Sequence, residues 1–272
     1  MTVEFSSALS APHSGRRKAV IIDHLRYTQS VILRGAPIPW DDPVSYANFN
    51  SQAQGLLPSD VTLFDAGAVY AYLLDQNEAL VSSISARSRT GYALKTLLAD
   101  VVSAKKAVDL AAVVSQTSKA PFVLQIPSPL SWLAETHRFS GSSEPVDTDD
   151  AENLCAYIAD WLRAFADLPV TAVLLDGRGL IPGGYEREEI TNYSPIINVT
   201  ENYRWALATR DTDTVTVTGS ILDDSSILSG TIIPEGFWTD ASQEVPNGAF
   251  YLAEIPADAI PETVLSQLKL LT

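Results

Sequence analysis

Short apolar runs alternate with longer stretches of helical periodicity along the chain. Three of the runs are apolar at nearly every position and end in turn residues, which is typical of strands buried on both faces of a parallel sheet. These runs are VTLF at 61–64, FVLQI at 122–126 and VTAVLL at 170–175. We predict a strand at each of the three places.

The stretches around these runs carry the signals of helices. Apolar residues recur at helical spacing over 17–34, and Gly35 follows as a stop. Asp42 precedes Pro43 and is placed to cap a helix over 43–57. Further helices are expected in segments rich in helix-forming residues: two or three between 70 and 117, one over 131–137 and one over 147–168.

The alternation of strands and helices predicts an α/β fold with parallel βαβ units. It weakens near the C-terminus, where strand candidates at 194–199, 214–219, 229–233 and 248–255 have little helix between them. Eight βα units take about 250 residues, so the chain of 272 residues fits one TIM-type (β/α)8 barrel whose C-terminal part is irregular or β-rich. A doubly wound sheet with a β-rich extension is the competing architecture. We expect residues 1–15 to form a polar arm and residues 16–272 to form the single barrel domain.

Charge and cysteine content narrow the range of partners. The formal net charge of −15 repels nucleic acid phosphates and anionic lipid. Cys155 is the only cysteine, so the chain holds neither an internal disulfide nor a multi-thiolate metal site. No apolar run reaches the length of a membrane span, and the N-terminus lacks the pattern of a signal peptide. We therefore expect a cytoplasmic protein that binds neither nucleic acid nor membrane.

Common cofactor and nucleophile motifs are missing from the sequence. There is no GxGxxG, GxxxxGK[ST] or GxSxG pattern, and the three histidines do not fall at metal-ligand spacing. These absences predict no metal site and leave the cofactor open. His24 is expected to be a satisfied core histidine, whereas His137, just beyond a predicted strand, is a candidate catalytic residue.

Polar residues at strand ends are the strongest local signal, because barrels and open α/β sheets both bind ligands there. Asp65 and Asp176 each follow an apolar run and are candidate acid–base or ligand-orienting groups. Arg178 could bind a substrate carboxylate, and Gln125 is a polar side chain within an apolar strand. Alternatively, Asp176 and Arg178 only cap their loop. The PGG segment at 182–184 is a candidate lid hinge.

Two further segments combine aromatic rings with polar groups. Asn198, Tyr203 and Arg204 lie in a segment that suits either a pocket for a planar or carboxylated molecule or a protein interface. Arg34 and Trp40 lie in a Pro-rich loop of similar character. All five are candidate substrate-binding residues.

The sequence resembles the superfamily of uroporphyrinogen decarboxylase and cobalamin-independent methionine synthase over about half its length. The matching pieces are IPSPL at 126–130 and LLDGRG at 174–179, together with the order of the segments around them. The resemblance implies a barrel with lyase or methyltransferase chemistry. The His and Cys zinc ligands of the methionine synthase branch have no counterpart here. Of the Arg-rich motif and the Asp of the decarboxylase branch, Arg34 and Asp65 alone stand in comparable places, and the family's barrels are longer than this chain.

Two hypotheses follow from these observations. The first is a metal-independent lyase or transferase that acts on a small carboxylated or aromatic metabolite, with Asp65 and Asp176 in one cleft. The second is a non-catalytic relative that binds a ligand or partner protein, with an exposed apolar patch near Trp205 or Trp238. In either case the segment 211–272 could complete the barrel or form the interface of a homodimer.

Overall fold

The computed structural model describes residues 4–179, 188–218, 227–240 and 243–271. Within these segments, eight strands form one sheet in the order β1-β8-β7-β6-β5-β4-β3-β2. The strands are β1 (Val20–Asp23), β2 (Thr62–Asp65), β3 (Phe122–Pro127), β4 (Val170–Asp176), β5 (Ala206–Arg210), β6 (Thr214–Thr218), β7 (Leu228–Ile232) and β8 (Tyr251–Glu254).

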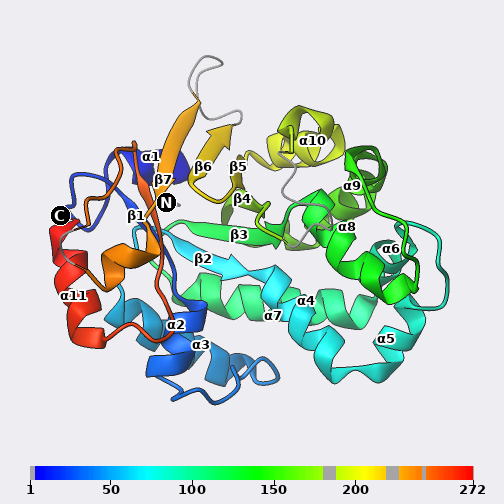
Figure 1. The fold of residues 1–272 in the computed structure, drawn as a ribbon, viewed down its shortest axis with the longest axis horizontal. Helices are drawn as coiled ribbons and strands as arrows, with labels where there is room; N and C mark the ends of the chain where they lie inside the picture. Colours follow the sequence, from blue (N-terminus) through cyan, green and yellow to red (C-terminus); the bar gives the residue numbers. More distant parts are fainter. Residues whose placement is uncertain (1–3, 180–187, 219–226, 241–242, 272) are drawn as a thin grey trace.

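Helices surround the sheet, with α11 on the opposite side of the molecule from α5 and α6 (Figure 1). The α-helices are α1 (Phe5–Ser10), α2 (Leu25–Val31), α3 (Pro43–Leu56), α4 (Ala66–Gln76), α5 (Glu78–Ile84), α6 (Tyr92–Leu98), α7 (Val101–Thr117), α8 (Pro129–His137), α9 (Thr148–Leu162), α10 (Ser194–Tyr203) and α11 (Pro261–Leu270). Short 3-10 turns lie at η1 (Arg138–Ser140), η2 (Arg163–Phe165), η3 (Ile190–Asn192) and η4 (Glu235–Trp238). None of the helices in the described segments is both long enough and apolar enough to cross a bilayer.

The sheet curves until it is nearly closed, and its inner face holds a separate apolar core. Successive side chains of a strand point to opposite faces, so the inward residues follow a two-residue period. They are Ile21, Leu63, Val123, Ala172, Leu174, Ala206, Ala208, Val215, Val217 and Leu252. Phe5 and Leu9 of α1 pack into the same cluster. This helix therefore contributes to the core, and the expectation of a polar arm over residues 1–15 is wrong for residues 5–10.

The sheet is mixed, which corrects the expectation of a purely parallel TIM-type barrel. β6 runs antiparallel to both β5 and β7, whereas all other pairs are parallel. Only residues 211–213 join β5 to β6, and a parallel crossover needs a dozen residues or more. The α/β class and the β-rich C-terminal part are as predicted, and the strict (β/α)8 pattern is not observed.

Several elements differ from the sequence prediction. The segment 17–34, expected as one helix, contains β1 and α2, because Val20, Ile21 and Ile22 are all buried and pair with β8. The segment 194–199, expected as a strand, belongs to α10, whose buried residues Ile196, Val199 and Thr200 follow helical spacing. β5 was not expected, and four helices rather than two or three occupy the region between 66 and 117.

Hydrogen bonds from the loop before β2 bridge the seam between β1 and β2, the two ends of the sheet. The Ile22 amide donates to Ser59 Oγ at 3.0 Å, and this hydroxyl donates to the Val20 carbonyl at 3.2 Å. Asp60 Oδ2 accepts from the Val20 amide at 2.9 Å and pairs with the buried Arg16 at 3.2 Å. Side chains thus replace the missing strand ladder and satisfy the backbone of β1.

Replacement of Ser59 by Ala is expected to lower the free energy of unfolding by about 1–2 kcal/mol, because it leaves the partly buried Ile22 amide without its partner. The Val20 carbonyl still accepts from the Asp60 amide at 3.0 Å. Urea unfolding followed by circular dichroism measures the change. Ser83→Ala is the matched control, because the Ser83 hydroxyl is exposed and bonds only to Ala79 of its own helix. Equal unfolding midpoints for the two variants would show that Ser59 does not hold the seam.

Candidate functional site

At the carboxyl ends of six strands, the residue that faces the inside of the sheet is polar instead of apolar. Each lies two residues beyond an inward apolar residue of the same strand, so each belongs to the same face of the sheet. These residues are Asp23 on β1, Asp65 on β2, Gln125 on β3, Asp176 on β4, Arg210 on β5 and Glu254 on β8. The strand register pairs Asp23 with Glu254, Asp65 with Gln125, and Asp176 with Arg210. The sequence thus places a ring of polar groups, called here the mouth, at one end of the sheet.

A cavity of about 610 Å³ opens at the mouth. Asp65 and Asp176, expected from the sequence to share one cleft, both line it. Its other polar side chains come from several elements: Asp23, Arg26, Gln125, Glu135, Arg178 and Glu254. The cavity has the size of a small-molecule site and is unusually rich in carboxyl groups.

Arg210 is the central cation of the mouth. Its side chain is fully buried, with Nη1 2.7 Å from Asp23 Oδ2 and Nη2 2.7 Å from Glu254 Oε2. Nη1 also lies 3.7 Å from Asp176 Oδ2. One guanidinium therefore links the end of β5 to the ends of the neighbouring strands β1 and β8.

Arg178 forms a second, bidentate pair. Its Nε donates to Asp176 Oδ1 at 2.9 Å and its Nη2 to Asp176 Oδ2 at 2.6 Å, while Nη1 donates to Glu254. Two guanidiniums are thus already engaged by three carboxylates. The expected role of Arg178 as a clamp for a substrate carboxylate would require it to leave these partners.

Asp65 differs from its neighbours because it forms no ion pair within the described part of the chain. It caps α4, with Oδ1 accepting from the Ala68 amide at 3.0 Å, and Oδ2 accepts from Gln125 Nε2 at 3.2 Å. Burial, followed by the negative charges of Asp23 and Asp176, raises the pKa of Asp65 to about 7. Its carboxyl group therefore gains and loses a proton near neutral pH.

Asp176 has the opposite behaviour. Burial would raise its pKa, but the hydrogen bonds from Arg178 and the charge of Arg210 outweigh that effect and lower the pKa below its ordinary value. Glu135 of α8 lines the same cavity, and burial raises its pKa in spite of the opposing charge of Arg138. The mouth thus combines Asp176, whose pKa is lowered, with Asp65 and Glu135, whose pKa values are raised.

Histidine and tryptophan candidates lie away from the mouth. His137 is buried at the end of α8, where Nε2 lies 3.1 Å from the Glu144 carbonyl, and it does not line the cavity. Trp40 is a core residue whose ring lies 4.7 Å from that of Tyr46. His24 is also buried, with Nδ1 3.2 Å from Thr28 Oγ1, as expected of a satisfied core histidine.

The remaining sequence candidates lie on the outer surface of the molecule. Arg34 and Asn198 are exposed and do not line the cavity. Tyr203 stacks on Trp205 at 4.8 Å, and Arg204 ends α10 just before β5 begins. Because β5 starts there and reaches the mouth at Arg210, Arg204 lies at the opposite end of the sheet. The structure does not bring these residues together with Asp65.

Three residues of the mouth were missed by sequence reasoning. Asp23 ends the apolar run AVII and carries the same signal as Asp65, but the prediction of a helix over 17–34 hid it. Arg210 ends ALATR, which contains two alanines and was not expected as a strand, and Glu254 lies near the end of the strand candidate 248–255 without having been singled out. Each of the three lies two residues after an inward-facing apolar residue of its strand, so the two-residue period of the strands is the signal that identifies them.

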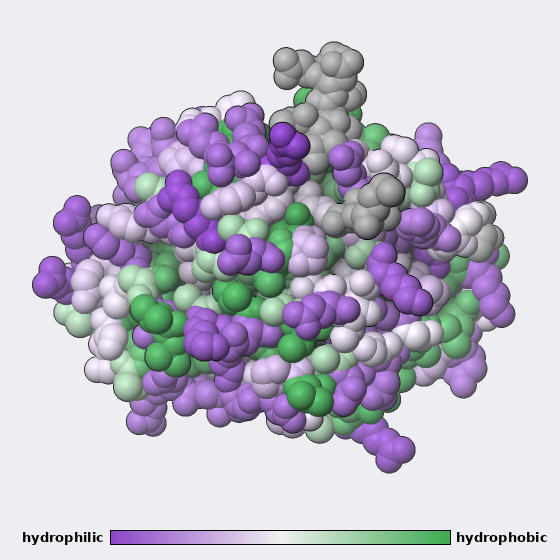
Figure 2. All heavy atoms as spheres, turned by 180° about the vertical axis from the view of Figure 1, so that it is seen from behind, coloured by the Kyte–Doolittle hydropathy of each residue, from purple (hydrophilic) through white to green (hydrophobic). Residues whose placement is uncertain are grey.

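Two expectations concern features outside the mouth. The PGG segment at 182–184, expected as a lid hinge, lies outside the described residues. The apolar patch near Trp205 or Trp238 stays a prediction. Both tryptophans are buried, but α11, which packs against η4, and the residue before it expose apolar side chains: Ile260, Leu265 and Leu270. Figure 2 shows polar side chains spread over the rear face, with smaller apolar areas between them.

Within the described segments, no group of three or more His, Cys, Asp or Glu side chains has an arrangement that could hold a metal ion. Gln125 and Arg178, the other two sequence candidates that lie in the mouth, are held by Asp65 and Asp176 respectively. The site must be interpreted from its own chemistry, because comparison of the chain with protein-family models, curated proteins and solved structures found no match.

Proposed function

We propose that this protein is an acid–base enzyme of the lyase or transferase class that acts on a small metabolite at the mouth, with Asp65 as the proton-transferring catalytic residue. The observation that carries the proposal is the opposite shift of two carboxyl groups in one cavity. The pKa of Asp65 is raised to about 7, whereas the pKa of Asp176 is lowered. Environments that separate the pKa values of neighbouring acids are a mark of acid–base sites.

Of the residues that the structure describes, one cation of the cavity remains to bind an anionic group of a substrate, whereas the carboxyl groups of the lining outnumber its arginines. Arg178 and Arg210 are balanced by Asp23, Asp176 and Glu254. Arg26, which is exposed at the rim, forms no ion pair with any residue that the structure describes. A substrate carboxylate would bind Arg26 while its reacting carbon lies over Asp65, which agrees with the small carboxylated metabolite expected from the sequence.

The proton step needs only the groups of the mouth. The Asp65 carboxylate takes a proton from a substrate carbon next to a carbonyl group, so an O–H bond forms on Asp65 and a C–H bond breaks. The electron pair stays on the substrate as an enolate. Asp65 reprotonates the enolate, or the pair forms a C=C bond while the bond from the next carbon to a leaving group breaks and that group departs with its electrons, as in a lyase. Gln125 orients the carboxyl group through its amide, and Asp176 stays ionised with Arg178.

Deuterium exchange tests this proposal without knowledge of the substrate. The purified protein is incubated in D₂O at pD 7.5 with a mixture of 2-oxo acids, hydroxy acids, amino acids and sugars, and mass spectrometry detects deuterium gained at carbon. We expect at least one compound to exchange with the wild type and not with Asp65→Asn. Asp109→Asn is the matched control, because Asp109 is exposed and pairs only with Lys105.

Two results would contradict the proposal. Exchange at the same rate in Asp65→Asn and wild type would remove Asp65 from the reaction. The second result would be a compound that binds at the mouth, detected because it changes the titration of Asp65, but that neither exchanges deuterium nor forms a product. That result would favour a non-catalytic binding protein.

A further inference from the structure

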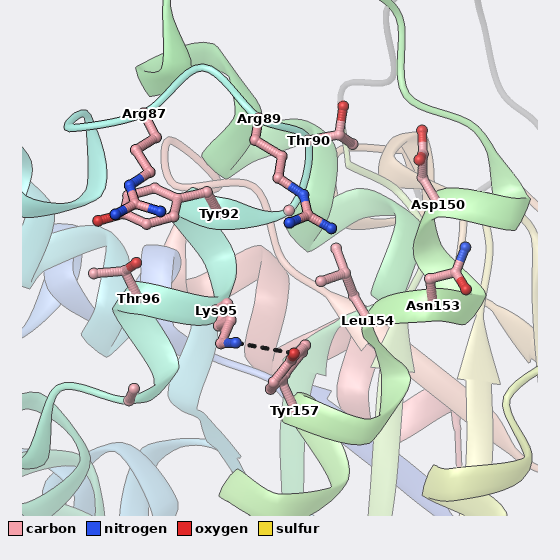
Figure 3. Close-up of a pocket in the computed structure, with 12 residues that line it drawn as sticks. Arg87, Arg89, Thr90, Tyr92, Lys95, Thr96, Asp150, Asn153, Leu154 and Tyr157 are labelled. Carbon is pink, nitrogen blue, oxygen red and sulfur yellow. Dashed lines mark hydrogen bonds between the residues drawn. The ribbon is translucent and has the colours of Figure 1, made fainter.

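A second cavity, of about 750 Å³, lies between α6 and the start of α9 (Figure 3). It shares no lining residue with the mouth. Its cationic side chains are Arg87, Arg89 and Lys95, and its one acidic side chain is Asp150. An excess of positive charge is notable in a chain whose formal net charge is −15, because it makes this cavity locally attractive to anions.

The three cations are not neutralised by carboxylates. None of them forms an ion pair with a residue in the described segments. Arg87 instead lies over the Tyr92 ring, 5.3 Å from its centroid, and Lys95 Nζ donates to Tyr157 Oη at 3.0 Å. Figure 3 shows the Arg89 guanidinium pointing into the space between Tyr92 and Leu154. Arg87 and Lys95 are thus held by aromatic side chains, and neither loses its charge to a carboxylate in the described segments.

The backbone that carries the two arginines is fixed against α9. Gly91 has a φ of 78°, and a Cβ atom there would lie 2.7 Å from Leu154 Cδ2. Glycine meets both requirements, since it tolerates positive φ and allows close approach. The loop before α6 therefore packs closely on α9 and presents Arg87 and Arg89 from a defined position.

We propose that this cavity binds the phosphate group of a small molecule. Arg guanidiniums bind phosphate oxygens through paired hydrogen bonds, and Lys95 adds a point charge. Thr90, Thr96 and Asn153 supply neutral polar groups on the walls. Cations already cover the Tyr92 and Tyr157 rings, so recognition depends on charge rather than on stacking. The volume exceeds that of a phosphate ion, which leaves room for an organic part. This inference does not depend on the proposed function.

Calorimetry tests the proposal with three probes at constant ionic strength: inorganic phosphate, ribose 5-phosphate and ribose. We expect one or both phosphate compounds to bind and ribose not to bind. Arg89→Ala is expected to weaken binding by about 10- to 100-fold, as for the loss of a hydrogen bond between charged groups. Lys119→Ala is the control, because Lys119 is an exposed cation that does not line the cavity.

The comparison between probes identifies the source of the phosphate. Tighter binding of ribose 5-phosphate indicates a phosphorylated metabolite, and tighter binding of inorganic phosphate indicates the free ion. Failure of both to bind at millimolar concentration would overturn the proposal. So would equal affinities of wild type and Arg89→Ala, provided that thermal melting shows both to be folded.

Discussion

Asp65→Asn is expected to lower the rate of substrate deuterium exchange by about 10²–10⁴-fold, the usual contribution of a positioned general acid or base, while it makes the folded protein more stable at pH 8. The two effects have one cause. Asp65 is half-buried near the charges of Asp23 and Asp176 and forms no ion pair with a described residue. The ionised form of Asp65 is therefore unfavourable in the native state. The presence of this residue is explained by its function and not by a contribution to stability.

The sign of the stability effect follows from the protonation states. The pKa of Asp65 is about 7 in the folded protein against an ordinary value of 3.8, so the native state binds the proton more tightly than the unfolded chain. Wild-type stability from this group is full below pH 4 and is lost as pH rises through 7. A shift of about three units corresponds to at most about 4 kcal/mol. An Asn side chain carries no charge, so the variant does not lose this stability as the pH rises.

Urea unfolding at pH 5, 6.5 and 8 measures the difference. The midpoint of Asp65→Asn is expected to exceed that of the wild type most at pH 8 and least at pH 5. The exposed control Asp109→Asn should differ from the wild type by a small, constant amount over this range. A loss of stability in Asp65→Asn that is the same at all three values would show that its role as the cap of α4 dominates and that its pKa is not raised.

The sequence predicts correctly those strands whose apolar pattern is not mixed with the pattern of a neighbouring helix. The runs at 62–65, 122–127 and 170–176 are apolar on both faces because helices cover one face and the inner core fills the other. β5 escaped notice because Ala206 and Ala208 face the crowded interior, and alanine carries no strand preference. β1 is four residues long and runs straight into α2, so its pattern merged with helical spacing.

The candidate site was predictable to the same extent. Asp65, Gln125, Asp176 and Arg178 follow recognised strands and all line the mouth. Asn198 and Arg204 were chosen for composition alone, and composition does not say at which end of a strand a residue lies. The role of Arg210 depends on Asp23, which is 187 positions away in the chain, and no local pattern contains such a contact.

Arg210→Met is expected to lower the free energy of unfolding by about 3–5 kcal/mol at neutral pH, because it removes one partner of a buried ion pair and leaves the other uncompensated. The Arg210 side chain is fully buried and that of Asp23 is 13% exposed. In this variant Glu254 and Asp176 still pair with Arg178, so Asp23 is the carboxylate that loses its cation. Arg163→Met is the control, since Arg163 pairs with Asp160 in solvent and its loss should cost less than 1 kcal/mol.

A double variant distinguishes loss of the pair from loss of packing. If the unpaired carboxylate is the cause, Asp23→Asn should restore much of the stability that Arg210→Met removes, because no buried charge is then left without a partner. Additive losses in the double variant would instead mean that Arg210 stabilises the mouth by filling space. Rescue would make the guanidinium the group that allows acidic side chains from β1, β4 and β8 to gather beside Asp65, where the charges of Asp23 and Asp176 add to the effect of burial on its pKa.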